Sequence, residues 1–121
     1  MAGTRVRIGR VYDEPTDQDG MRVLVDRLWP RGLSKTRAAL DEWCKQVAPS
    51  TELRRWYGHA PERFAEFGRR YRAELEAGEQ AAALDHLRAI ARDHDLMLLT
   101  ASKDVAISEA AVLVELLQRR G

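Results

Sequence analysis

Two short, uninterrupted apolar runs constrain the fold of this chain more than any other feature. They read VLV and LMLL, and they lie in the segments 21–26 and 96–100. Apolar runs of this length are typical of parallel strands that are covered on both faces. A further strand is predicted at 5–12, where Val6 and Ile8 alternate with polar residues and glycine. The sequence therefore predicts a sheet whose strands lie near both ends of the chain.

The residues between the second and third predicted strands have helical periodicity. Leu40, Trp43, Cys44 and Val47 recur at the spacing of one helix face. Helices are predicted at 36–47, 50–57, 61–78, 79–94 and 105–119, with Ser50 as an N-cap and Gly58 just beyond the end of the second.

Strands separated by helices can pair in parallel, so the pattern predicts an α/β fold. We expect a small, partly parallel sheet of about three to four strands, covered by about five helices. A fourth strand would lie in one of the linkers. A length of 121 residues fits a single layered domain, 1–121.

Composition excludes several classes of protein. A net charge of +1 argues against bulk electrostatic capture of nucleic acid, although a local basic patch is compatible with it. No run of about 18 apolar residues exists, and the first residues lack an apolar signal core, so we expect a cytoplasmic protein without a membrane span. The single cysteine, Cys44, and three scattered histidines predict no disulfide, no metal and no cofactor.

Two polar segments follow the second and third strands, namely DRLWPRGLSK at 26–35 and TASKD at 100–104. The carboxyl ends of parallel strands meet at one edge of a sheet, which is where ligands bind in open α/β folds. Two predicted helix N-termini, near Thr36 and Val105, also point there. Four cations and two acids would gather at this edge: Arg27, Arg31, Lys35, Lys103, Asp26 and Asp104. Guanidinium groups favour planar carboxylate or phosphate groups, so the edge predicts an anion pocket.

Each of these residues also has a structural interpretation. Asp26 can pair with a neighbouring cation to hold the edge together, and Asp104 can be only an N-cap. Trp29 can stack on a flat ligand, although packing against the core is the commoner role of a tryptophan. His59, in the turn YGHAP, is either a proton carrier or a partner for helix-end carbonyls. Cys44, beside a tryptophan on an apolar face, is predicted to be structural.

Three longer stretches carry specific motifs, namely RVLVDRLWPRGLSK, LDEWCKQVAPSTELRRWYGH and FGRRYRAEL. They resemble the short YeaO-like branch of the domain-of-unknown-function 488 (DUF488) family. The resemblance implies no assigned activity, and some members bear transcription-regulator labels. Two departures stand out. Ala60 replaces a commonly acidic residue, and the segment 107–109 supplies Ile, Ser and Glu where relatives often carry Asn or His before the last helix.

Our first hypothesis is a small protein that binds an anionic small molecule at the carboxyl edge of its sheet, with or without catalysis. The predicted ligand-binding residues are Arg27, Trp29, Arg31, Lys35 and Lys103, and the predicted acid–base residues are Asp26, His59 and Asp104.

The alternative is a nucleic-acid-binding or regulatory module that uses basic helical patches. These comprise Arg54, Arg55, Arg69, Arg70 and Arg72. Interspersed glutamates explain the same patches as ion-paired, solvated helix faces. A third possibility is a partner subunit with an exposed apolar face. The sequence leaves the oligomeric state open.

Overall fold

The computed structural model describes residues 4–118, and its centre is a four-stranded sheet with the order β1-β4-β2-β3. The strands are β1 (Val6–Arg10), β2 (Met21–Leu24), β3 (Glu42–Trp43) and β4 (Leu96–Thr100). Every pair of neighbours is parallel, with Ile8 opposite Leu98 and Val23 opposite the same residue on the other side. The α/β prediction is confirmed, and the sheet is parallel throughout these residues.

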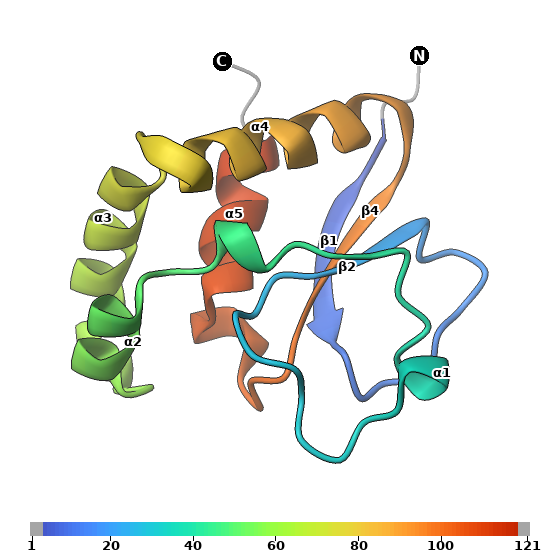
Figure 1. Ribbon diagram of the computed structural model, residues 1–121, viewed down its shortest axis with the longest axis horizontal. Helices are drawn as coiled ribbons and strands as arrows, with labels where there is room; N and C mark the ends of the chain where they lie inside the picture. Colours follow the sequence, from blue (N-terminus) through green and yellow to red (C-terminus); the bar gives the residue numbers. More distant parts are fainter. Residues whose placement is uncertain (1–3, 119–121) are drawn as a thin grey trace.

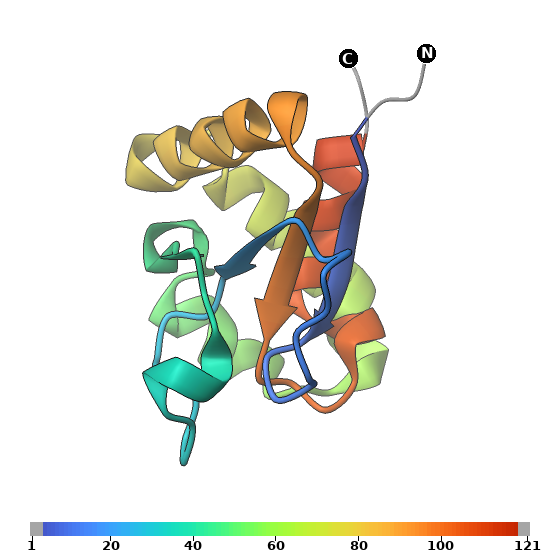
Figure 2. The ribbon, with the colours of Figure 1, turned by 90° about the vertical axis from the view of Figure 1, so that its right-hand side faces the viewer.

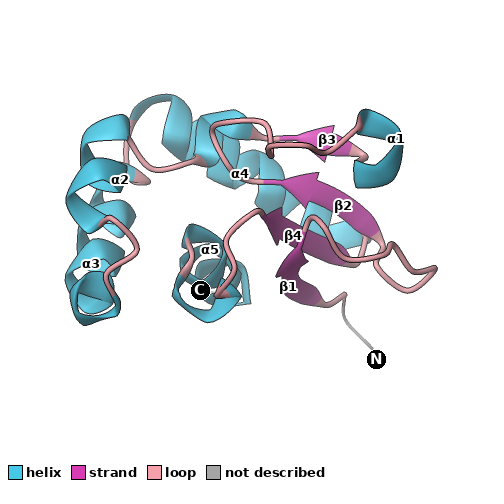
Figure 3. Cartoon of the chain, turned by 90° about the horizontal axis from the view of Figure 1, so that it is seen from below, coloured by secondary structure: helices cyan, strands magenta, loops and turns pink. Residues whose placement is uncertain are grey.

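Five α-helices lie within the described residues. They are α1 (Lys35–Ala38), α2 (Thr51–Tyr57), α3 (Phe64–Glu74), α4 (Gly78–Asp93) and α5 (Glu109–Gln118). Three short 3-10 turns accompany them, at η1 (Lys45–Val47), η2 (Pro61–Arg63) and η3 (Val105–Ile107). Figures 1 and 3 show α2 to α5 on one side of the sheet, with α1 and the long loops on the other.

The two faces of the sheet bury separate apolar clusters. The larger, helix-side cluster lies under the helices, and its residues Val23, Leu98 and Leu113 are fully buried. The smaller, loop-side cluster lies under the loops and includes Leu24 and Leu99. Neighbouring residues of β2 and β4 thus enter opposite clusters, as the alternation of side chains along a strand requires. This double burial explains why both strands read as continuous apolar runs.

The prediction of a single helix at 36–47 is wrong. Ala39 adopts a left-handed backbone (φ 49°) and ends α1 after one turn. The chain then forms β3, because Cys44 N donates to Leu24 O (2.8 Å) on the neighbouring strand. The expected fourth strand therefore lies inside a segment predicted as helix.

Other boundaries are closer to prediction. Strand β4 has the predicted bounds. Helix α2 begins one residue after the predicted start, with the Ser50 hydroxyl accepting a bond from Leu53 N and Gly58 left-handed at the end. The third predicted helix divides into η2 and α3 and ends at Glu74. Gly78 begins α4 instead of ending the third helix. The last predicted helix divides into η3 and α5, and its expected end at position 119 lies outside the described residues.

The face covered by loops is held by a buried ion pair. Arg22 Nη1 lies 2.6 Å from Asp19 Oδ2, and both side chains are almost fully buried. Arg22 also donates from Nε to Ala39 O (3.1 Å) and from Nη2 to Ala38 O (2.9 Å). This arginine thus ties β2 to the loop before it and to the end of α1.

The carboxyl ends of the strands lie together, and the arrowheads of β1 and β4 point the same way in Figure 2. Segments that follow β2 and β4 therefore meet at one edge of the sheet, as the sequence predicts. No helix among residues 4–118 has the length and apolar character needed to cross a membrane.

Candidate functional site

A cavity of about 530 Å³ opens at the carboxyl edge of the sheet, and we name it the carboxyl-end cavity. Its volume is in the range of small-molecule sites. Side chains reach it from the segments after β2 and β4, from α2 and α3, and from the start of α5. Its lining includes Tyr12, Asp26, Arg27, Leu28, Trp29, Pro30, Arg31, Pro49, Arg54, Arg55, Tyr57, His59, Phe67, Ala101, Ser102, Ser108 and Glu109.

Asp26 joins the two central strands at the floor of this cavity. Its Oδ1 accepts from Thr100 Oγ1 (2.8 Å), and its Oδ2 accepts from Ala101 N (2.8 Å). Its backbone carbonyl accepts from Trp43 Nε1 at 2.7 Å. The carboxylate therefore fixes the end of β2 against the end of β4, and it also faces the cavity.

Glu109 is the first residue of α5 and lies beside Asp26. Burial raises its pKa well above the ordinary glutamate value, and so do the hydrogen bond with Asp26 and the charge of that carboxylate. Its own backbone N–H and the positive charge of Arg54 act in the opposite direction. Asp26 already accepts two other hydrogen bonds, so the shared proton resides on Glu109.

Two arginines of the cavity carry unsatisfied donors. The Nε atoms of Arg27 and Arg54 are buried and have no hydrogen-bond partner among the described residues. Within residues 4–118, the Arg27 side chain donates only a long bond, from Nη2 to Ala48 O (3.3 Å). A buried donor without a partner is costly, and it can indicate the place of a ligand. Arg7 on β1 has the same unsatisfied Nε, but it lies outside the cavity.

Arg31 and Arg55 add positive charge at the cavity mouth, where both side chains are exposed. With Glu109 protonated, four guanidinium groups face the single negative charge of Asp26. The arrangement can therefore attract and hold an anion, and the guanidinium groups suit a planar or tetrahedral oxyanion.

Aromatic side chains form the apolar part of the lining. Tyr57 stacks on Phe67 with 4.3 Å between ring centroids, and its hydroxyl donates to Ile107 O (2.7 Å). Trp29 donates from Nε1 to Leu33 O (2.7 Å) and packs edge-on against Trp43, 5.4 Å away. The tryptophan is thus held by packing, and one of its surfaces also lines the cavity.

His59 lies at the mouth with an exposed ring and a left-handed backbone (φ 57°). That conformation is uncommon for a residue other than glycine and places the ring 6.1 Å from Tyr57. His59 is thus the histidine of the described chain that can meet a ligand in this cavity.

Three predicted site residues do not line the cavity. Lys35 lies on the exposed helix α1, and Lys103 is exposed in the loop after β4. Asp104 caps η3, where its Oδ1 accepts from Ala106 N (3.2 Å). The other five, Asp26, Arg27, Trp29, Arg31 and His59, lie together around the cavity.

Arg54, Arg55 and Glu109 are charged residues of the cavity that the sequence analysis did not place there. Arg54 and Arg55 were assigned to a basic helical patch, because their arginine-rich surroundings resemble a solvated helix face. Glu109 had one signal, since it falls where the family often carries another polar residue. None of these positions follows from strand ends, because each depends on how a helix packs against the sheet.

The remaining basic residues of α3 form ion pairs. Arg70 Nε lies 2.8 Å from Glu66 Oε2, Arg69 pairs with the same glutamate, and Arg72 Nη2 lies 3.4 Å from Glu115. The two pairs with Glu66 are at helical spacing and match the interpretation as a solvated helix face, whereas the pair with Glu115 joins α3 to α5.

Cys44 is buried in the helix-side cluster, away from the cavity. Burial, with a smaller contribution from Glu42, raises its thiol pKa to about 11. A thiol that stays protonated at neutral pH is a poor nucleophile, as the structural prediction requires.

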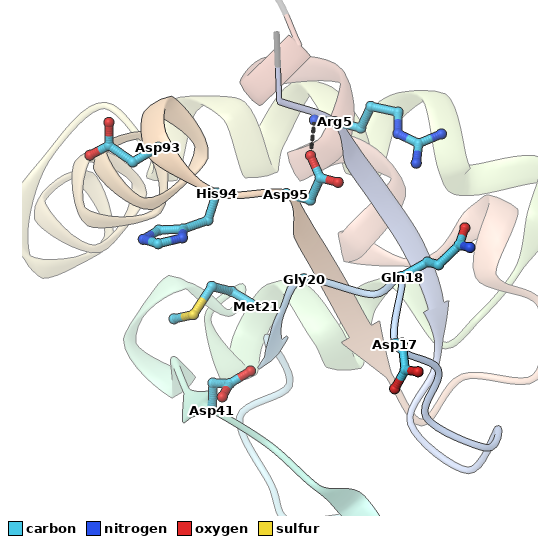
Figure 4. A pocket seen from close by; sticks show the side chains of 9 residues that line it. All are labelled: Arg5, Asp17, Gln18, Gly20, Met21, Asp41, Asp93, His94 and Asp95. Atoms are coloured by element: carbon cyan, nitrogen blue, oxygen red, sulfur yellow. Dashed lines mark hydrogen bonds between the residues drawn. The ribbon is translucent and has the colours of Figure 1, made fainter. Parts of the chain in front are cut away.

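A second hollow, of about 510 Å³, lies at the opposite end of the sheet and is acidic (Figure 4). Two of its carboxylates have structural partners. Asp95 accepts from Arg5 N (2.9 Å), and Asp41 accepts from Arg22 N (2.8 Å). No group of three potential metal ligands occurs within residues 4–118. These carboxylates cap the beginnings of strands, so the carboxyl-end cavity is the better candidate.

Comparison with known proteins gives the family. Residues 5–120 match the family described as the inactive DUF488-N3 subclade. The chain belongs to this DUF488 subclade. The uncharacterized protein Rv3073c of Mycobacterium tuberculosis is 50% identical over 117 residues, which is 97% of each chain. The uncharacterized protein YeaO of Escherichia coli is 43% identical over 113 residues, which is 93% of this chain and 96% of YeaO. The resemblance to the YeaO-like branch is confirmed, and no solved structure matches the chain.

Proposed function

We propose that this DUF488 protein binds an anionic small molecule in the carboxyl-end cavity. The observation that carries the proposal is the pair of arginines, Arg27 and Arg54, whose buried Nε atoms lack partners in the same cavity. A phosphate, sulfate or carboxylate group would satisfy both donors. The aromatic lining leaves room for an apolar ligand body.

The family match favours a protein that binds its ligand without catalysing a reaction. The subclade is described as inactive, and this chain matches it over residues 5–120. The Asp26–Glu109 pair has the residue types for acid–base chemistry, but Asp26 is committed to joining β2 and β4. We therefore assign the pair to the charge balance of a binding site.

A thermal-shift titration with sodium sulfate, phosphate and short carboxylic acids tests the proposal, with sodium chloride added to constant ionic strength. A ligand that binds only the folded state raises the Tm with its concentration. We expect stabilisation by at least one of these anions in the wild type and its loss in Arg54→Ala.

Lys103→Ala is the matched control, because it removes a cation near the same edge that does not line the cavity. It should retain the stabilisation. Equal loss in both variants would indicate a diffuse electrostatic effect and would refute the assignment to the cavity. Stabilisation by oligonucleotides alone, retained in Arg54→Ala, would place the function on the basic helices instead.

A further inference from the structure

The proton shared by Asp26 and Glu109 is the feature of the cavity that the proposed function does not yet use. Both oxygens of Asp26 accept bonds from the end of β4, at Thr100 and Ala101. Glu109 supplies the third bond to this carboxylate. With its proton, the Asp26–Glu109 pair carries one negative charge. Without the proton, both carboxylates are charged and lie in contact with each other.

The groups that face Glu109 come from three other segments. They are Asp26 after β2, Arg54 and Tyr57 on α2, and Tyr71 on α3. Burial, together with nearby carboxylates, raises the pKa of both tyrosines, so they remain neutral at ordinary pH. Arg54 is the cation of this set. An ionised Glu109 would therefore draw Arg54 into an ion pair.

Building on the proposed function, we propose that Glu109 determines the anion affinity of the cavity: the site takes an oxyanion only while a proton bridges Glu109 and Asp26. The protonated pair leaves the Arg54 guanidinium free for the ligand. The ionised pair adds a negative charge and competes for that guanidinium. Binding is thus coupled to the retention of one proton by the protein, with no covalent step.

The ligand class that fits is the anion of a strong oxyacid, such as a sulfate, a sulfonate or a phosphate ester. Such a group keeps at least one negative charge at a pH where Glu109 still holds its proton. It also offers several acceptor oxygens to the Arg27 and Arg54 donors.

Sulfate is the appropriate probe, because its charge does not change between about pH 5.5 and 8.5. Isothermal titration of the wild type at increasing pH should show Kd rising once Glu109, whose pKa is raised, begins to ionise, by up to about tenfold per pH unit. Glu109→Gln keeps a donor for Asp26 but cannot ionise. This variant should bind sulfate with a Kd that stays near its low-pH value across the range.

His59 also lines the cavity, so His59→Gln is the second variant. It should retain the rise of Kd with pH. A rise that persists in Glu109→Gln, or that disappears in His59→Gln, would overturn the assignment to Glu109.

Proton coupling can also be measured on the wild type alone, which protects the test if a variant does not fold. Titrations at one pH within the range, in two buffers of different ionisation enthalpy, should give different binding enthalpies. Equal enthalpies and a Kd independent of pH would refute this inference while leaving the proposed function intact. Absence of sulfate binding at every pH, with no effect of any other anion, would refute both.

Discussion

Replacing Arg22 with methionine should destabilise the protein more than any single change in the carboxyl-end cavity. Arg22 is 6% exposed and satisfies three acceptors: Asp19 at 2.6 Å and the carbonyls of Ala38 and Ala39. Methionine fills much of the same volume but offers no donor. The variant therefore leaves a buried carboxylate and two carbonyls without this partner.

Breaking a buried ion pair by removing one partner costs about 3–5 kcal/mol. Three hydrogen bonds to a charged group are consistent with the upper part of that range. We therefore expect the free energy of unfolding to fall by about 4 kcal/mol. For a chain of this length, that loss lowers the Tm by about 15 °C.

Denaturant unfolding followed by tryptophan fluorescence measures the effect. The double variant Asp19→Asn/Arg22→Met should be more stable than Arg22→Met by about 1–2 kcal/mol, because no buried charge is then unpaired. A cost below about 1 kcal/mol for Arg22→Met would refute the reasoning. So would a double variant that is less stable than Arg22→Met.

Acid should reproduce part of this loss. Burial raises the pKa of Asp19, but hydrogen bonds from Thr16 and Arg22 outweigh it, and the net pKa is lowered. The stabilising contribution of Asp19 is therefore complete above the ordinary aspartate pKa, about 3.9, and is lost as the pH falls through the lowered value. Asp19→Asn should remove this part of the acid dependence.

Three further predictions concern other positions. Gly20 and Gly32 both have positive φ, but only at Gly20 would a Cβ meet a backbone atom, 2.3 Å from Asp95 O; Gly20→Ala should thus cost about 1–3 kcal/mol more than Gly32→Ala in denaturant unfolding. The Cys44 thiol, with a pKa of about 11, should not react with a disulfide reagent at pH 8 until the protein is unfolded. Glu109 has a raised pKa, so wild-type stability should fall as the pH rises from about 4.3 toward that value, and Glu109→Gln should not show this fall.

The strands were predictable because burial on both faces leaves a continuous apolar run in the sequence. The strand within the segment 36–47 could not be predicted, for a physical reason. Its apolar residues have helical spacing, yet Leu40 and Trp43 pack into the loop-side cluster while Cys44 and Val47 pack into the helix-side cluster. Backbone pairing with β2 separates the four residues onto opposite faces of the sheet. Periodicity alone cannot show this choice, because it depends on a neighbouring strand.

The residues of the candidate site also fall into a predictable group and an unpredictable group. Parallel strand ends predict where Asp26, Arg27 and Arg31 lie, since topology alone brings those segments to one edge. Arg54 and Glu109 reach the cavity from helices, and their directions follow from packing against the sheet. A sequence shows which residues occupy those helices, but it does not show which helix face turns toward the strand ends.

Arg22 and Arg54 show how one residue type serves structure in one place and binding in another. The Arg22 nitrogens all have protein partners, which leaves no donor for a ligand. The Arg54 side chain has no hydrogen bond or ion pair within the described residues, and its Nε is buried at the cavity. Removing Arg22 should therefore unfold the protein more easily, whereas removing Arg54 should abolish anion binding at little cost in stability. If removing Arg54 instead unfolded the protein and removing Arg22 did not, the cavity arginines would hold the fold and the ligand would bind elsewhere.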